Sequence, residues 1–223
     1  MERIIKFFVF PAALVGTSGF AVALWQSIPS ALTQWQSHWP FPAGIILYLL
    51  LWRFVFSRRA PFWSIVEHEL THAVFALLCF KRVRALNAYR KRGGRVVVEG
   101  GNFVIALAPY VFPLPILFLI LAKWMIVPQY NALLNFFLGF FLMFHLIPLF
   151  YEYHPSQPDI RGTGILFSTI IILFGNLFFV GLTLAALEPG AVHIPRYLKT
   201  GWEVSLHNAH WLSQWIWQQL MTR

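Results

Sequence analysis

Long apolar stretches recur along this chain, and they limit the folds that it can adopt. An apolar run of about 18 residues or more can cross the hydrocarbon core of a bilayer as a helix, and several such runs are separated here by short polar or proline-rich breaks. Charged residues make up only 11% of the chain, whereas they make up about a quarter of an ordinary soluble domain. We therefore expect an all-α polytopic membrane protein with no room for a large soluble domain.

The apolar runs predict six transmembrane helices. The second of them is short and contains Arg53. The fourth contains Pro109, Pro113 and Pro115, and we interpret this proline-rich run as a break in the span that could serve as a gate. The predicted spans cover residues 4–25, 41–56, 62–80, 103–127, 130–150 and 164–187.

A basic segment between the third and fourth predicted spans is too polar to cross a membrane. Its valines, Val83 and then residues 96–98, lie on either side of Gly93 and Gly94, and a glycine pair between such runs is typical of a turn that joins two strands. We predict a short basic β-hairpin after the third span. A plain basic loop is the alternative.

The end of the chain has a different character from the spans. Residues 202–220 carry apolar side chains at near-helical spacing and include four tryptophans, a residue that favours the membrane interface. This pattern predicts a C-terminal amphipathic helix that lies on the membrane surface and has no catalytic role.

The first predicted span has a second interpretation. Arg3 and Lys6 precede an apolar stretch that contains the small residues Ala21 and Ala23, and this order is also that of a cleaved secretory signal peptide. We favour a span that stays in place.

The charge distribution bears on partners and orientation. In a membrane protein, Lys and Arg collect in loops that face the anionic cytoplasmic leaflet, so we assign the net charge of +9 to topology and contact with the lipid bilayer, and we expect no nucleic-acid partner. Basic residues lie at both ends of the third span, with Arg58 and Arg59 at one end and a larger cluster within residues 81–95 at the other. The larger cluster favours a cytoplasmic hairpin.

The third span contains a candidate metal site. Its sequence includes His68, Glu69 and His72 in an HEXXH pattern, and residues four apart share one face of a helix, so both imidazoles can reach one ion. Catalytic zinc sites combine such ligands with a carboxylate and keep the fourth position for water, whose pKa falls towards neutrality. Glu69 is then placed to act as the general base. Thiolate ligation is limited, because Cys79 is the only cysteine.

Ionisable residues within an apolar span also favour a functional site. Each one costs about 2 to 3 kcal/mol at the centre of a membrane helix, and Glu67 lies beside the HEXXH residues. A buried polar patch that pairs helices without a metal is the alternative.

The third metal ligand is to be sought between the fifth and sixth predicted spans. Asp159 is the only aspartate of the chain and lies in this break. Glu152 and His154 lie in the same break and compete with it, since Glu152 preserves a two-histidine, one-carboxylate set and His154 makes a three-histidine site. Within the fifth span, His145 could donate a hydrogen bond to a bound peptide or pair two helices.

Two stretches resemble the site-2 protease family of intramembrane zinc metalloproteases, the M50 peptidases. The first is VEHELTHAVFALLCFKRVRALNA, in which the HEXXH helix leads into a basic hairpin; the second is FHLIPLFYEYHPSQPDIRGTG, which is similar to the family's Asn-x-x-Pro segment and its ligand aspartate. In this chain His145 takes the place of the asparagine, and Ile160 and Arg161 follow Asp159 before the glycine. The chain has no room for the PDZ domain of several members.

The resemblance implies a function and a division of the chain. It implies that His68, His72 and Asp159 bind Zn²⁺, that Glu69 is the general base, and that the enzyme cleaves membrane-spanning protein substrates. Its hairpin would present the substrate as an extended strand along residues 95–99. We therefore expect N-terminal transmembrane segments over residues 1–61, a metalloprotease core over 62–187 and an interfacial helix over 188–223. The small size of the chain and the lack of a long targeting region favour a bacterial cytoplasmic membrane.

Other functions stay open at this point. A membrane zinc protease resembling the CAAX-processing or HtpX enzymes would call for a Glu-x-x-x-Asp pattern, and no glutamate lies four residues before Asp159. A membrane di-iron hydroxylase would need several clustered histidine motifs. A non-catalytic metal-binding protein that retains the protease fold is the main alternative. The pattern indicates neither the substrate, nor the trigger for cleavage, nor the oligomeric state.

Overall fold

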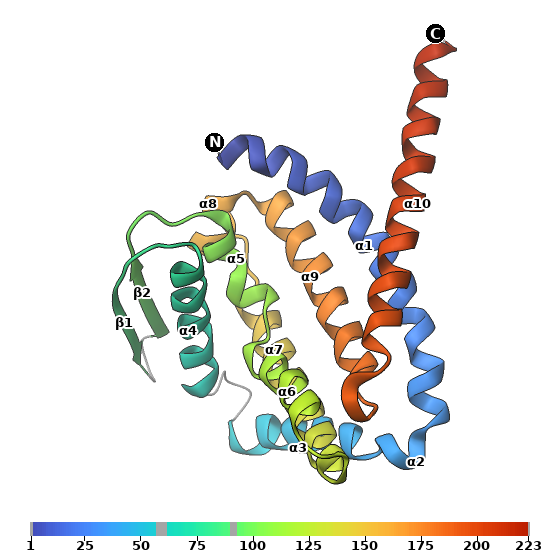
Figure 1. The fold of residues 1–223 in the computed structure, drawn as a ribbon. Helices are drawn as coiled ribbons and strands as arrows, with labels where there is room; N and C mark the ends of the chain where they lie inside the picture. Colours follow the sequence, from blue (N-terminus) through green and yellow to red (C-terminus); the bar gives the residue numbers. More distant parts are fainter. Residues whose placement is uncertain (1, 57–61, 90–92, 223) are drawn as a thin grey trace.

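The computed structural model describes residues 2–56, 62–89 and 93–222, and it is mostly helical (Figure 1). Each of the six predicted spans is helical in it. The helices that correspond to these spans are α1 (Glu2–Thr33), α3 (Pro40–Leu50) with the π-helical turn η1 (Leu51–Val55), α4 (Phe62–Leu78), α5 (Phe103–Val111), α6 (Leu114–Met125), α7 (Asn131–Glu152) and α9 (Ile165–Ala185). Shorter elements are α2 (Trp35–His38), η2 (Pro128–Tyr130), α8 (Pro158–Thr163) and η3 (Pro189–Ala191), and α10 (Ile194–Met221) ends the chain.

The predicted count of six spans is not confirmed. Among the described residues, three helices are long and apolar enough to cross a membrane, and there are four if the bent pair of α5 and α6 counts as one span. The helix formed by Pro40–Val55 is apolar but shorter than a full span. In α4, which has 17 residues, the ionisable cluster around the HEXXH motif lowers the hydropathy. Helix formation was thus predicted better than membrane crossing.

The proline-rich fourth span is broken, as its sequence suggested. The axes of α5 and α6 differ by 70°, and the break falls at Phe112, where the backbone is extended, and at Pro113, where it is not helical. Proline has no N–H to continue the helical ladder. Pro113 is fully buried, so the break is packed against the rest of the protein.

The polar segment after α4 is a β-hairpin. Strand β1 (Val83–Tyr89) pairs antiparallel with β2 (Gly93–Val98), and the pair packs against α4. The position predicted for the turn was wrong, because Gly93 and Gly94 both belong to β2 and Tyr89 pairs with Gly93. The residues that connect the strands, 90–92, lie outside the described residues.

Small residues allow close helix contacts. A Cβ atom at Gly139 of α7 would overlap the carbonyl oxygen of Phe41, and one at Gly44 of α3 would overlap that of Phe136. Between α1 and α10, Gly19 lies against Gly201 in the same way. Such contacts between small residues are a usual way to associate helices in a membrane, where lipid provides no hydrophobic driving force.

The C-terminal helix was predicted correctly, and α10 runs antiparallel to α1 (Figure 1). Its first half packs along α1 and α9, and Asn208 donates a hydrogen bond to Ser18 Oγ at 2.9 Å. Its position on the membrane surface stays a prediction. For the first half of α10, the packing favours a position alongside the candidate spans α1 and α9. These contacts also favour retention of the first span, because cleavage near Ala23 would remove much of the surface that α10 covers.

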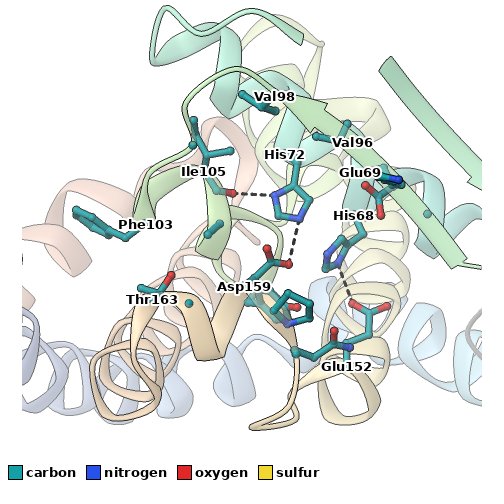
Figure 2. A pocket seen from close by; sticks show the side chains of 18 of the residues that line it. His68, Glu69, His72, Val96, Val98, Phe103, Ile105, Glu152, Asp159 and Thr163 are labelled. Atoms are coloured by element: carbon teal, nitrogen blue, oxygen red, sulfur yellow. Dashed lines mark hydrogen bonds and ion pairs between the residues drawn. The ribbon is translucent and has the colours of Figure 1, made fainter. Parts of the chain in front are cut away.

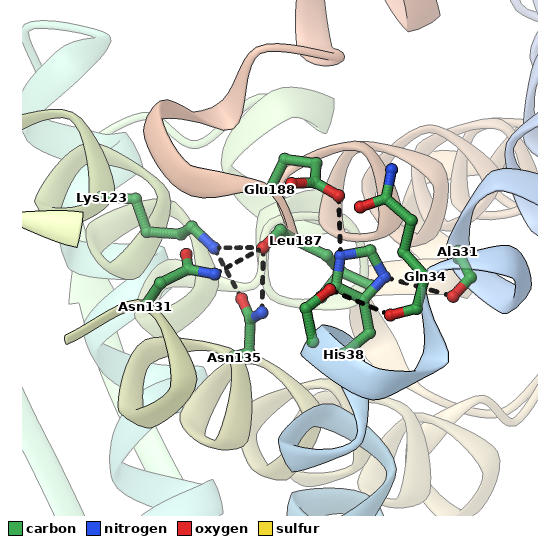
Figure 3. Close-up of polar contacts among 9 residues, drawn as sticks. Ala31, Gln34, His38, Lys123, Asn131, Asn135, Leu187 and Glu188 are labelled. Atoms are coloured by element: carbon green, nitrogen blue, oxygen red, sulfur yellow. Dashed lines mark hydrogen bonds and ion pairs between the residues drawn. The ribbon is translucent and has the colours of Figure 1, made fainter. Parts of the chain in front are cut away.

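A group of polar contacts lies just after the C-terminal end of α9 (Figure 3). The carbonyl oxygen of Leu187 accepts hydrogen bonds from Lys123 Nζ at 2.9 Å, Asn135 Nδ2 at 2.9 Å and Asn131 Nδ2 at 3.1 Å. Lys123 is 3% exposed, and it also donates to Asn135 Oδ1 at 2.6 Å. These bonds satisfy a backbone acceptor where a helix ends, and they tie α6 and α7 to the end of α9.

Candidate metal centre

The HEXXH histidines face the same pocket (Figure 2). His68 and His72 lie one turn apart on α4, and their ring centres are 4.9 Å apart. Asp159 approaches from α8, with its Oδ2 atom 3.6 Å from His72 Nε2. The potential ligand atoms of these three residues all lie within 4.8 Å of one another. The structure therefore brings together the three residues that the sequence indicated as metal ligands.

Hydrogen bonds orient both imidazole rings. His68 Nδ1 lies 2.9 Å from Glu152 Oε2, and His72 Nδ1 lies 2.8 Å from the carbonyl oxygen of Ile105. Since a carboxylate and a carbonyl can only accept, each Nδ1 carries the proton and donates it. The lone pair of a neutral ring is then on Nε2, and this is the arrangement found in proteins whose histidines bind zinc. Two imidazole nitrogens and one carboxylate oxygen suit Zn²⁺.

The two competing ligands have other contacts. Glu152, the last residue of α7, accepts the hydrogen bond from His68 instead of joining the ligand group. His154 is exposed, and its Nδ1 atom lies 2.7 Å from Ser156 Oγ. The geometry favours Asp159 over both as the third ligand, and ligation itself stays a prediction.

Glu69 lies in the same pocket as the histidines. It is 7% exposed and lines the pocket together with residues of β2. A Cβ atom at Gly94 would overlap the Glu69 side chain, so a larger residue at this place would displace Glu69. The hairpin therefore forms a wall of the pocket beside the predicted general base.

The pocket lies near one end of the helices. It has a volume of about 800 Å³ and is lined by residues of α4, β2, α5 and α8, by the last residue of α7 and by the first residue of α1. The residues that approach or orient the histidines come from α5, from the end of α7 and from α8. The HEXXH residues lie in the middle of α4, and the connection between α7 and α9 contributes the aspartate.

Some contributors to the site have no sequence signal. The Tyr110 ring packs edge-on against His68, with ring centres 5.2 Å apart, and Tyr110 lines the pocket. The carbonyl of Ile105 belongs to an apolar helix in which nothing marks it as a partner of His72. Only the packing of α5 on α4 reveals them.

His145 has a structural contact rather than a place in the pocket. Its Nε2 atom lies 3.2 Å from Asn176 Oδ1, and Asn176 Nδ2 donates to the carbonyl of Tyr110 at 2.8 Å. His145 is buried and is not among the residues that line the pocket. Of its two predicted roles, the structure favours pairing of α7 with α9.

Comparison with known protein families supports an assignment of the chain. A family model described as Peptidase M50B-like matches residues 41–189, more than half of the chain. The matched region contains the HEXXH helix, the hairpin and α8, and it excludes α1 and α10. No curated protein matches, and no solved structure matches.

Proposed function

The chain belongs to the Peptidase M50B-like family, and from this premise we propose that it is an intramembrane zinc metalloprotease that hydrolyses peptide bonds of membrane-spanning proteins. Family membership supports a membrane metalloprotease, and the apolar helices support an integral membrane protein. The zinc protease proposal depends on one observation. The potential ligand atoms of His68, His72 and Asp159 lie close together, and the Nδ1 atoms of both histidines are already hydrogen-bonded.

The proposed ligands are His68 Nε2, His72 Nε2 and a carboxylate oxygen of Asp159. Zinc bound there would supply a Lewis acid that polarises the substrate carbonyl and activates water. Glu152 and the carbonyl of Ile105 hold the two rings in the tautomer that leaves Nε2 free to bind. These two groups orient the imidazole rings, because a ring that turns away from the ion binds it weakly.

Glu69 is the proposed general base. It lies on the same helix between the two histidines and reaches the same pocket, so it can take a proton from the attacking water and pass it to the leaving amine. Glu69 is 7% exposed and lies beside β2, which lines the same pocket.

Strand β2 is the proposed docking edge for the substrate. It pairs with β1 along one edge, and among the described residues no strand pairs with the other. A peptide bond within a helix is hydrogen-bonded and shielded, so a substrate helix must unwind before cleavage. An unwound segment could add to β2 by backbone hydrogen bonds, which would bring its peptide bonds to the pocket that Arg95, Val96 and Val98 line.

The test combines zinc content with cleavage. Wild-type protein purified in detergent is expected to contain about one zinc per chain and to cleave a model transmembrane substrate, whereas Glu69→Gln keeps the zinc and loses cleavage by a factor of at least about 100, since acid–base catalysis typically contributes 10²–10⁴-fold. Glu203→Gln, on the exposed surface of α10, serves as the matched control and retains both.

Each outcome separates the candidate functions. Stoichiometric zinc with equal cleavage by wild type and Glu69→Gln would leave only a metal-binding membrane protein. Absence of zinc from the wild type would overturn the proposal.

A bacterial cytoplasmic membrane is the proposed location.

A further inference from the structure

Lysine 6, on the first helix and outside the matched family region, contacts the wall of the metal pocket. Its Nζ atom donates a hydrogen bond at 3.1 Å to the carbonyl oxygen of Thr163, the last residue of α8. It also forms an ion pair at 2.9 Å with Glu2, one turn earlier on α1, and Glu2 lines the pocket. A cation thus joins the start of α1 to the helix that carries Asp159.

The helix α8 needs tertiary contacts to hold its place. It has only six residues, and isolated helices of this length are not stable in water. Ile160 anchors one face, since it is completely buried and its carbonyl accepts a hydrogen bond from Ser168 Oγ at 3.2 Å. The final carbonyls of a helix lack partners within it and carry partial negative charge. An ammonium group at Thr163 satisfies one of them and adds a favourable charge interaction.

The same ammonium group also faces the start of α5. It lies 5.8 Å from the centre of the Phe103 ring and 5.5 Å from that of Phe167, within the range of a cation–π interaction. Phe103 begins α5, and two residues later the carbonyl of Ile105 accepts the hydrogen bond from His72. Lys6 therefore contacts both helices that approach His72. These are α5, which carries the carbonyl of Ile105, and α8, which carries Asp159.

From these contacts we propose that Lys6 is a positioning residue for the metal centre: it holds the end of α8 against the start of α5 and thereby keeps Asp159 within ligand distance of the two histidines. This inference rests on the proposed function. It assigns to α1 a role in a site whose ligands all lie within the matched region. The positioning acts through the backbone of Thr163, four residues after Asp159.

Metal affinity tests this role without recourse to activity. Metal-free full-length protein in detergent is titrated with Zn²⁺ against a chelating competitor, and with Co²⁺ while the ligand-field absorption is recorded. Lys6→Met keeps the apolar stem and removes the charge; we expect at least about tenfold weaker metal binding, as for other residues that orient ligands, and an altered Co²⁺ spectrum. Lys6→Arg keeps a cation at the same place and restores both properties to near wild type.

The matched control is Lys199→Met. Lys199 pairs with Glu203 one turn later on α10 at 3.8 Å, is largely exposed and is not among the residues that line the pocket, so its substitution is expected to leave metal affinity unchanged. If Lys6→Met is too unstable to purify, Lys6→Gln, which retains a hydrogen-bond donor, replaces it in the same comparison.

The outcomes distinguish this inference from the proposed function. A wild type that binds zinc while the Lys6→Met variant binds it equally well, with the same Co²⁺ spectrum, would overturn the positioning role and leave the protease proposal intact. A lower melting temperature of metal-free Lys6→Met with unchanged affinity would make Lys6 a purely structural residue and would overturn it as well. A wild type without metal affinity would end both proposals.

Discussion

At the scale of single residues, the two histidines of the HEXXH helix differ in what holds them. His72 is oriented by a backbone carbonyl, which no substitution of a side chain removes, whereas His68 depends on the carboxylate of Glu152. Because Glu152 also competed for the role of ligand, its substitution separates the two interpretations of the site.

We expect Glu152→Ala to weaken zinc binding without abolishing it. Loss of the acceptor frees the His68 ring to rotate, and loss of such partners typically lowers metal affinity by 10- to 100-fold. The stoichiometry of about one zinc per chain should persist at high metal concentration, measured by competition with a chelator.

Two further substitutions control this result. His154→Ala removes an exposed histidine that contacts Ser156, and it is expected to bind zinc like the wild type. Asp159→Ala removes a proposed ligand and should weaken binding more than Glu152→Ala does. A larger loss from His154→Ala than from Asp159→Ala would refute the assignment of the third ligand.

At the scale of elements, close contacts between helix backbones accompany the burial of large side chains. The contact of α3 with α7 brings two backbones together at Gly44 and Gly139, where a single added carbon overlaps a carbonyl oxygen. Because the overlapping atoms are backbone atoms, a side chain at either glycine would force the two helices apart.

Gly139→Ala is therefore expected to lower the thermal stability of the protein in detergent. Overpacking of a tight contact typically costs about 1–3 kcal/mol, and the higher helix propensity of alanine recovers at most about 1 kcal/mol of this loss. Gly101→Ala is the control, because a Cβ atom there meets nothing within 4 Å. Equal melting temperatures of the two variants would show that the close approach contributes no stability.

At the scale of the whole molecule, the metal pocket and the hairpin share one end of the bundle. The first turn of α1, the end of α4 and the start of α9 lie at this end, whereas α2 lies at the opposite end (Figure 1). Orientation in the membrane therefore decides on which side of the bilayer a substrate meets the site. The basic residues of the hairpin favour the cytoplasmic side.

The single native cysteine allows this orientation to be measured. Cys79 follows α4 and precedes the hairpin, so we expect it to resist a membrane-impermeant maleimide added to intact cells and to react after permeabilisation. In a Cys79→Ser background, Ser37→Cys on the exposed surface of α2 should react without permeabilisation. The reverse pattern would place the hairpin and the pocket outside the cytoplasm.

Much of the fold was accessible from local patterns. Apolar runs predicted the helices, the valines around the glycine pair predicted the hairpin, and the prolines of the fourth span predicted its break. The number of crossings was not determined, since α3 and α4 are shorter or more polar than a full span. Helix formation depends on neighbours along the chain, whereas crossing depends on how short helices are placed among longer ones.

For the candidate site, the sequence by itself determined the pair of histidines and the glutamate between them, because a spacing of four residues places two side chains on one helix face whatever surrounds the helix. The tertiary structure alone decided which residue of the connection between α7 and α9 approaches them, which groups orient their rings, and that Lys6 reaches the helix of Asp159. These contacts join residues 33 to 157 positions apart, and no local period relates positions so distant; only the packing of the helices brings them together.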